Sequence, residues 1–428
     1  MGESQTCSGP AGEQGQAGVL CAAIRSGGIV AVGQPAQTLQ LDLESWQAIL
    51  QQPLATLQDW VRQPAGAGDG AREHAARLLA SLPPRRDLSR ERAEALFLAA
   101  LMLPLARVRE RLAGDDLGIG RARNALFGLD LPGPLRDHVL WLVRSAKLPQ
   151  QFGRREPALG RLLRLAWTLD TELLLLLALA ACEANGVATA APCRSGAESF
   201  GGHCRQLGLL GRQPAPLVPR SRWLLIAPAD SDLRRRLAGE LRLWRLKGIV
   251  QTRAEAEAWV RGQQATLGGT LYLPVGVPGS GKSTWVEQNL QQATNVSMDD
   301  MREQLLGDRA DQSRNPEVYR RCRAMLGRAL RAGETVVWDA QSHTWAARQS
   351  LLAAAREAHA YVVVVCFDVP LDVALRRNAR RAQPVPEHVI RRSYRQLEEP
   401  RPFEAEELWR VDVDGRTTRQ VADDTSGA

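Results

Sequence analysis

Lysine is nearly absent from this chain. Among 55 basic residues in a total of 428, only Lys147, Lys247 and Lys282 are lysines. Arginine therefore supplies almost all of the positive charge behind the net charge of +8. Such heavy use of arginine and alanine reflects genome composition as readily as function. The basic balance alone is thus weak evidence for a nucleic acid partner.

The sequence also lacks closely spaced metal ligands, a secretion signal and an apolar run long enough to span a membrane. Its seven cysteines show no paired spacing, and Cys193 and Cys204 beside His203 are too few to close a zinc site. We expect structural cysteines in a reducing cytosol. The longest apolar run, 173–182, is about half a membrane span and predicts a buried helix. We therefore predict a soluble, cytoplasmic protein without a membrane partner.

Composition and periodicity divide the chain into five parts. Hydrophobic residues make up 44% of it, which is enough to bury real cores. The parts are a poorly ordered N-terminal arm at 1–45, a helical domain at 46–186, a connector with a small α/β unit at 187–267, an α/β domain at 268–415 and a tail at 416–428. Within the arm, 27–33 could form a short strand. The predicted fold class is an all-α domain followed by an α/β domain with a parallel sheet, flanking helices and a helical lid.

The helical domain is predicted from leucines and alanines that recur at three- and four-residue spacing. Its helices are expected at 46–62, 72–82, 88–112, 134–146 and 158–185. Beyond them, 186–222 is rich in Gly, Pro and Ser and predicts a partly ordered connector. A strand near 223–227 and helices near 230–247 and 253–265 follow. The arginines at 234–236 predict a solvated basic face, with contact to a polyanion as the minority alternative.

A phosphate-binding motif follows the apolar, strand-length run 271–275. It reads Gly-x-x-x-x-Gly-Lys-Ser at 276–283 and precedes a segment of helical character at 285–292, the context in which this motif binds nucleotide phosphates. Its glycines let backbone N–H groups converge on phosphate oxygens, and the helix N-terminus adds partial positive charge. We predict that Lys282 contacts the β- and γ-phosphates of ATP and that the Ser283 hydroxyl ligates Mg²⁺. The predicted nucleotide-binding residues are Gly276, Pro278, Gly279, Ser280, Gly281, Lys282, Ser283 and Thr284.

Aspartates follow two more predicted strands, at 295–298 and 335–338. Ligands of open α/β sheets lie beyond the carboxyl ends of the strands. Asp299 is therefore predicted to act as general base toward an acceptor hydroxyl, and Asp300 to cap the next helix. Asp339 is predicted to bind magnesium through water or to hold the acceptor. A simple turn residue at the strand end is the alternative.

An arginine-rich segment, 374–381, follows a fourth predicted strand. That strand, 361–367, is a continuous β-branched run, which is typical of burial on both faces. Pro384, Pro386 and a further helix at 387–398 complete a predicted helix–loop–helix lid over ATP. Arginines close to the phosphates can stabilise the charge of a transferring phosphoryl group. A solvated basic helix is the alternative.

Together, these elements resemble the polynucleotide 5′-hydroxyl kinases of the phage type, over about 268–412. The resemblance is carried by the P-loop with Trp285, by Asp299-Asp-Met-Arg302, and by Arg377, Asn378 and Arg381 with Val385-Pro386. It implies that Asp299 activates the 5′-hydroxyl and that Arg302 holds the neighbouring phosphate of the acceptor. It also implies that Arg377 and Arg381 clamp the ATP phosphates, with Arg381 counted as catalytic beside Lys282. The chain departs from the family at 339–341, where Asp-Ala-Gln replaces Asp-Thr-Asn. This difference affects the residues expected to contact the acceptor, and so the identity of the substrate.

Phage members of that family also carry a phosphatase domain. Its nucleophile motif is imitated by Asp-Val-Asp-Gly at 412–415. Arg416 interrupts the motif, and only a short tail follows. We therefore interpret 412–415 as a tight Asp-Gly turn.

The helical region resembles late helices of HD-superfamily phosphohydrolases at 135–143 and 163–170. An active HD domain needs a His-Asp pair and further ligands around a metal. The expected helix at 99–104 contains neither residue type, and the Asp-His pair at 137–138 has the wrong order. His74 is the one plausible relic. We predict a scaffold without phosphohydrolase activity, and its protein partner is not identified by the sequence.

The sequence thus predicts an ATP-dependent phosphotransferase that acts on a 5′-hydroxyl end of RNA or DNA, with RNA favoured. A small-molecule or protein-directed P-loop kinase is the second interpretation, since zeta-toxin-like and antibiotic kinases share this layout. The third is a non-enzymatic binding module regulated by ATP, in which the helical domain recruits a partner.

Overall fold

The computed structural model describes most of the chain as two compact units. The described residues are 74–75, 77–82, 88–107, 118–129, 131–154, 159–185, 187–226, 231–262, 268–309 and 311–421. One unit comprises 1–155 and 172–203, and the other comprises 156–171 and 204–428. The strand expected at 27–33 and the helix expected at 46–62 lie outside the described residues.

The first unit is built from helices. They are α4 (Arg90–Arg107), α5 (Ile119–Phe127), α6 (Gly133–Ser145), a 3₁₀ turn (Pro149–Arg154), α8 (Thr171–Ala184) and α9 (Val187–Gln206). The apolar stripe of α4 is fully buried from Ala95 to Leu103, and α4 packs against α5 and α6. Cys182 and Cys193 form a disulfide with their Cα atoms 5.7 Å apart. The expectation of reduced cysteines is therefore wrong for this pair.

Helix α9 corrects the expected connector. Gly, Pro and Ser in this stretch predicted irregular structure, yet a 20-residue helix spans most of it. Phe200 is buried in edge-to-face contact with Phe152, with ring centroids 5.2 Å apart. Packing of this aromatic side chain outweighs the weak helix propensity of the neighbouring small residues.

Four helices of the second unit precede its sheet. They are α7 (Leu159–Thr168), α10 (Arg220–Ile226), α11 (Ser231–Leu246) and α12 (Arg253–Arg261). The strand predicted near 223–227 is wrong, because 223–226 belong to α10. A short apolar run does not distinguish a strand from a buried helical turn, and Trp223 packs into a small core with α11 and α12. The single helix expected at 158–185 is likewise two helices, α7 and α8. Among the described residues no single helix is long and apolar enough to cross a membrane, and only α7 and α8 taken together pass that test.

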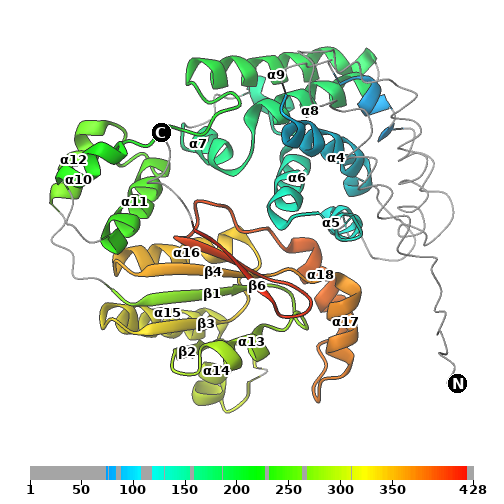
Figure 1. Ribbon diagram of the computed structural model, residues 1–428. Helices are drawn as coiled ribbons and strands as arrows, with labels where there is room; N and C mark the ends of the chain where they lie inside the picture. Colours follow the sequence, from blue (N-terminus) through cyan, green and yellow to red (C-terminus); the bar gives the residue numbers. More distant parts are fainter. Residues whose placement is uncertain are drawn as a thin grey trace, which may run out of the picture. The chain divides into compact units, whose positions relative to one another are not determined.

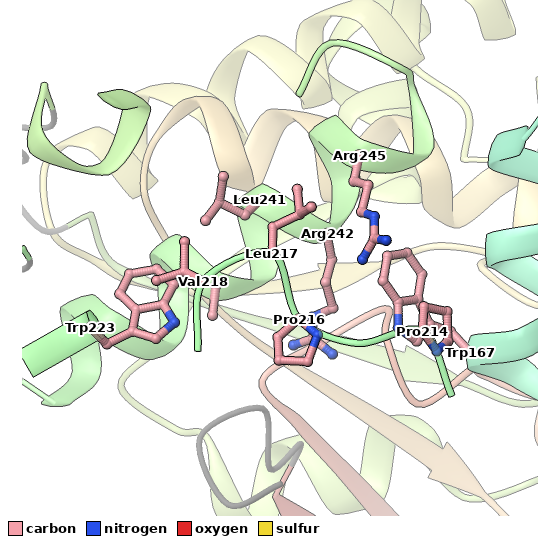
Figure 2. A pocket seen from close by; sticks show the side chains of 10 residues that line it. Trp167, Pro214, Pro216, Leu217, Val218, Trp223, Leu241, Arg242 and Arg245 are labelled. Carbon is pink, nitrogen blue, oxygen red and sulfur yellow. The ribbon is translucent and has the colours of Figure 1, made fainter. Parts of the chain in front are cut away.

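A pocket lies beneath the proline-rich segment 214–218 (Figure 2). Its walls come from α7, α10 and α11, and its polar side chains are Arg242 and Arg245. Arg245 donates to the carbonyl of Ala215 at 2.6 Å, and its guanidinium lies 5.6 Å from the ring centroid of Trp167. These contacts hold the segment against α11, and none of the predicted site residues lines this pocket.

The sheet of the second unit has six strands (Figure 1). In spatial order they are β2 (Thr294–Ser297), β3 (Thr335–Asp339), β1 (Thr270–Val275), β4 (Tyr361–Phe367), β5 (Glu407–Val411) and β6 (Thr417–Val421). All neighbours pair in parallel except β5 and β6. The four predicted strands are confirmed, whereas β5 and β6 were missed. Gly415, with φ of 82°, and the bond from Gly415 N to Asp412 O make the tight turn predicted at 412–415.

Helices cover the sheet as buried parallel strands require. They are α13 (Lys282–Asn289), α14 (Met298–Leu306), α15 (Asn315–Arg331), α16 (Trp345–Glu357), α17 (Leu371–Ala379) and α18 (Glu387–Gln396). Every residue of β4 is buried. Trp285 of α13 packs on the face formed by Val363, Val365 and Trp409. The predicted fold class, an α/β domain with a largely parallel sheet preceded by helices, is confirmed.

Polar contacts fasten α11 to the amino end of the sheet. Arg236 is buried and donates to the carbonyls of Gly268 at 2.6 Å and His359 at 2.7 Å. His359 Nδ1 lies 2.8 Å from Glu240 Oε1. The arginines at 234–236 are therefore not simply a solvated face, because Arg236 satisfies backbone carbonyls at the start of β1 and β4.

Candidate nucleotide-binding and phosphotransfer site

The P-loop connects β1 to α13 and has the backbone shape that its glycines permit. Gly279 and Gly281 have φ values of 82° and 101°, in the left-handed region that favours glycine. A Cβ on Gly279 would lie 2.3 Å from the carbonyl oxygen of Ala374 in α17. Glycine at this position therefore allows α17 to approach the loop directly.

Lys282 begins α13 and folds over the loop. Its Nζ donates to the carbonyls of Gly276 at 2.9 Å and Val277 at 2.8 Å. Burial of the ammonium group lowers the pKa of Lys282 to about 8; the charge of Asp339 opposes this shift and that of Arg381 adds to it. The lysine is thus directed into the concave side of the loop, beside a carboxylate.

The loop fits the phosphates of a nucleotide. The Ser280 hydroxyl is buried without a hydrogen-bond partner among the described residues. A Cβ on Gly276 would lie 2.7 Å from that hydroxyl, so glycine at this position leaves room for the Ser280 side chain. Ser283 and Thr284 are exposed in the first turn of α13, where backbone N–H groups and the helix dipole favour anions.

Asp299 lies just beyond the carboxyl end of β2, in the first turn of α14. Its side chain is 68% exposed and accepts a hydrogen bond from Arg302. The prediction that Asp300 caps α14 is wrong. Ser297 is the cap, and its hydroxyl accepts from the Asp300 N–H at 3.2 Å. The cap is shifted because β2 ends one residue earlier than predicted. The Asp300 side chain pairs with Arg309 instead.

Asp339 closes β3 beside this carboxylate. Ser297 and Asp339 are partners in the register of β2 and β3, so both strand ends meet at one edge. Burial raises the pKa of Asp339, the charge of Lys282 opposes this shift, and Asp299 adds to it. The structure therefore brings Lys282, Asp299 and Asp339 into one electrostatic cluster.

Arg302 lies behind Asp299 and is largely buried. Its side chain is 12% exposed. Nε donates to Asn315 Oδ1 at 3.0 Å, and Nη1 donates to Asp299 and to the carbonyl of Arg309 at 3.3 Å. These bonds fix the guanidinium against α14 and α15 and orient Asp299.

The predicted lid is a helix–loop–helix formed by α17 and α18. The Asn378 amide closes its loop by bonding both the N–H and the carbonyl of Val385, at 3.0 and 2.8 Å. Arg377 donates to the carbonyl of Ser280 in the P-loop at 3.2 Å and also to that of Val413 in the β5–β6 turn. Arg381 is exposed, and its charge acts on Lys282. Arg377 thus contacts the P-loop, and the charge of Arg381 reaches the P-loop lysine.

Comparison with known proteins agrees with this geometry at the level of the domain. Residues 271–400 match the family model described as an AAA domain. This part of the chain is a P-loop kinase-like domain. The chain is also similar to one in the "Structure of the Pnkp1/Rnl/Hen1 RNA repair complex", with 22% identity and a TM-score of 0.29. That match covers 32% of this chain and 46%, about half, of the other. None of the curated proteins matches.

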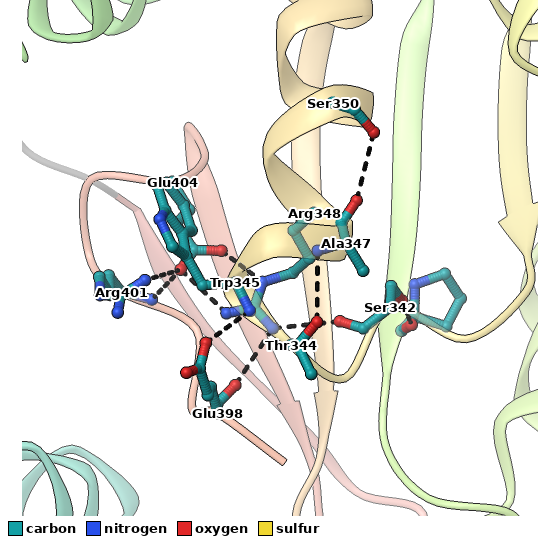
Figure 3. A network of polar contacts seen from close by, with 10 residues as sticks. Ser342, Thr344, Trp345, Ala347, Arg348, Ser350, Glu398, Arg401 and Glu404 are labelled. Carbon is teal, nitrogen blue, oxygen red and sulfur yellow. Dashed lines mark hydrogen bonds and ion pairs between the residues drawn. The ribbon is translucent and has the colours of Figure 1, made fainter. Parts of the chain in front are cut away.

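A buried polar network in the kinase-like domain links α16 to the segments after β3 and α18 (Figure 3). Arg348 is fully buried and bonds both carboxylate oxygens of Glu404, at 2.5 and 3.0 Å. It also donates to the carbonyls of Ser342 and Glu398, each at 3.1 Å. The Ser342 hydroxyl donates to Pro274 at 2.6 Å, in the strand that enters the P-loop. One guanidinium thus joins the segment after α18 to the loop after β3.

Sequence reasoning missed Arg348 and also His343, which is buried in that loop. Burial lowers the pKa of His343; a hydrogen bond with Gln396 of α18 opposes the shift, and the charge of Lys282 adds to it. His343 therefore contacts α18 through Gln396, and the charge of the P-loop lysine reaches its imidazole. Its sequence signal, one histidine four residues after a strand-end aspartate, is too weak to detect alone.

The residues assigned to an HD-like helix do not form a site. The apolar residues at 99–103 are buried in α4. Burial, together with the charges of Arg107 and Arg77, lowers the pKa of His74. Within the described residues no group of three or more potential ligands could hold a metal ion. The HD-like character and its loss of activity stay predictions.

Proposed function

We propose that this protein is an ATP-dependent kinase that phosphorylates the 5′-hydroxyl end of a nucleic acid, RNA in preference to DNA. The observation that carries the proposal is the position of Asp299. It is an exposed carboxylate at the end of β2, oriented by Arg302 and close to the cluster of Lys282 and Asp339. An acceptor hydroxyl at this edge would lie between a base and the P-loop.

The charge and position of each site residue suggest its role in the transfer. Lys282 and the loop N–H groups would bind the β- and γ-phosphates, and Ser283 would hold Mg²⁺, which when bound neutralises phosphate charge. Asp299 accepts the hydroxyl proton while the acceptor oxygen bonds to the γ-phosphorus and the bond to ADP breaks. Arg377 and Arg381 would stabilise the transferring charge, since Arg377 contacts the P-loop and the charge of Arg381 reaches Lys282.

The choice of a nucleic acid acceptor rests on the Asp-Asp-Met-Arg element. It resembles the corresponding element of polynucleotide kinases, and Arg302 and Arg309 place positive charge beside Asp299. A phosphodiester backbone needs such cations to approach two carboxylates.

Transfer from γ-labelled ATP to matched 5′-hydroxyl RNA and DNA oligonucleotides tests the proposal. We expect labelled 5′ ends, and none on 5′-phosphorylated controls. Asp299→Ala should reduce turnover about 10²- to 10⁴-fold, the usual contribution of general acid–base catalysis, while ATP binding persists. Unimpaired turnover in the variant would contradict the assigned base.

A small-molecule or protein-directed kinase is the second candidate. It is favoured by Ala340 and Gln341 after Asp339, where polynucleotide kinases carry Thr and Asn. Transfer to a metabolite or protein but to neither oligonucleotide would select it. A chain that binds ATP and transfers phosphate to none of these would instead be an ATP-regulated binding module.

A further inference from the structure

One face of α11 gives the pocket beneath segment 214–218 an apolar part and a cationic part. Ala238 and Leu241 line the pocket from the middle of the helix, whereas Arg242 and Arg245 line it from near the C-terminal end. These four positions have the three- and four-residue spacing of a single helical face. Every lining residue belongs to the second unit. A ligand with an apolar body and a polar head group matches this arrangement.

Two tryptophans mark the two parts of the pocket. Trp223 of α10 is 4% exposed and belongs with Leu241 to the small apolar core of this region. Trp167 of α7 lies beside Arg245, whose guanidinium is 5.6 Å from the centroid of the ring. Figure 2 shows Trp223 at one end of the row of lining side chains, and Trp167 with Arg245 at the other. The apolar part therefore adjoins α10, and the cationic part adjoins α7.

The segment that covers the pocket is held in place within the protein itself. Pro214 and Pro216 have restricted backbone φ angles. Arg245 Nη1 donates to the carbonyl of Ala215 at 2.6 Å, which ties the segment between the two prolines to α11. Binding to a pocket that is already formed loses little free energy to the ordering of its walls. Because prolines lack an N–H group, the arginines are the donors that these walls offer to an anion.

The positive charge of the pocket is not balanced by an acidic residue. Among the described residues that line it, Arg242 and Arg245 are the charged ones, and none is an aspartate or glutamate. Burial lowers the pKa of Arg245, and no carboxylate of the described chain opposes this shift. Arg164 lies one turn before Trp167 on α7, and its pKa is lowered by burial and by the charge of Arg161. Partly desolvated guanidinium groups favour a negatively charged partner.

We propose that this pocket binds a small aromatic carboxylate, with the ring against the apolar part and the carboxylate on Arg242 and Arg245. A guanidinium binds a carboxylate through two parallel, charge-assisted hydrogen bonds. It has five N–H donors, so Arg245 can bind the ligand while it keeps its bond to Ala215. Two indoles in the lining favour a ring over an aliphatic chain, because aromatic pairs stabilise beyond the area they bury. The residues assigned to phosphotransfer do not line this pocket, so this binding is independent of the proposed function.

Titration of the full chain with benzoate, followed by saturation-transfer NMR, tests the proposal. Benzamide is the matched neutral probe, and acetate is the matched probe without a ring. We expect benzoate to bind with a Kd of about 1 mM. Benzamide and acetate should each bind at least about tenfold more weakly, since one lacks the charge and the other the apolar surface. Saturating ATP should leave benzoate bound.

Two variants test whether benzoate occupies this pocket. Arg242→Met removes one charge and keeps an unbranched side chain, and it should weaken benzoate binding about tenfold. Ala238→Leu fills the apolar part and should weaken binding at least as much, with both arginines retained. Arg234→Met is the matched control, because Arg234 lies on the same helix and does not line the pocket. It should bind benzoate as the wild-type chain does.

Three results would overturn the proposal. Equal affinity for benzoate and benzamide would show that the arginines do not select an anion. Displacement of benzoate by ATP would assign it to the P-loop. Unchanged benzoate affinity in the folded pocket variants, with folding checked by their affinity for ATP, would place the ligand on other arginines. If Ala238→Leu does not fold, Arg242→Met and the benzamide comparison decide the question.

Discussion

In the free protein, burial disfavours the charged form of Lys282, the form that would bind phosphates. Its ammonium group has exchanged water for two backbone carbonyls, which explains the lowered pKa. Nucleotide phosphates would supply the missing negative charge. The binding of ATP should therefore be linked to protonation of this side chain.

We predict that the affinity for ATP is flat below pH 8 and falls as the pH rises above it. Below about 8, the pKa of Lys282, the free site is already charged; above it, binding must take up a proton. Calorimetry at pH 8.5 in buffers of different ionisation enthalpy should detect this uptake. Lys282→Arg should bind more weakly but without the pH dependence, since arginine stays protonated. Equal affinity of the wild-type chain at pH 7 and pH 9 would contradict the linkage.

The same pKa sets the sign of a stability effect. The unfolded chain holds the Lys282 proton up to about pH 10.5, its ordinary value, whereas the folded chain releases it near 8. The unfolded state therefore binds more protons between these values, and this residue makes the free energy of unfolding rise with pH there.

At the scale of elements, the kinase-like domain contains a buried ion pair between distant segments. Arg348 of α16 and Glu404, after α18, are 56 residues apart and both fully buried. Removing one partner of such a pair leaves an uncompensated buried charge, which costs about 3–5 kcal/mol. The pair thus joins the segment after α18 to α16, and breaking it should be costly.

We predict that Glu404→Gln and Arg348→Met each lower the free energy of unfolding by about 3 kcal/mol or more, as measured by urea titration. The double variant should lose less than the sum, because neither charge is then left alone. Arg391→Ala is the control, since it breaks the exposed Arg391–Glu387 pair of α18 and should cost under about 1 kcal/mol. Additive losses in the double variant would show that the two side chains do not act as a pair.

The elements that were predicted correctly are those whose sequence pattern is contained within a short segment of the chain. The P-loop lies between a strand and a helix within about twenty residues, and β4 is one unbroken β-branched run. Strand β5 was missed because Leu408 and Trp409 stand in a short segment without alternation, and its pairing with β4 is long-range. Trp223 was assigned to a strand for the same reason, since its helix is decided by packing against α11. Arg348 and Arg309 looked like ordinary surface arginines, because the residues that flank them in the sequence do not reveal their burial or their tertiary contacts.

At the scale of the molecule, residues 204–262 form part of the body that carries the kinase-like site. Arg236 donates hydrogen bonds to the carbonyls of Gly268 and His359. Gly239 of the same helix lies against Glu406, because a Cβ added to it would be 2.5 Å from Glu406 Oε1. Glu406 in turn pairs with Arg356 and accepts from the Val362 N–H at 2.8 Å. The helix therefore adjoins a buried ion pair at the start of β4, and the two should unfold together.

We predict that Arg236→Ala lowers hydrogen-exchange protection in α11, β1 and β4 by a similar factor. Loss of its bonds leaves the carbonyls of Gly268 and His359 buried without these donors, at a cost of about 1–3 kcal/mol. Arg234→Ala removes the same charge from the same helix and should leave β1 and β4 unchanged, because the effect depends on those two carbonyls rather than on helix charge. If protection fell in α11 alone, the helix would be an appendage and the sheet would be stable without it. A fall shared by all three elements would mean that α11 belongs to the cooperative unit that holds Lys282 in place.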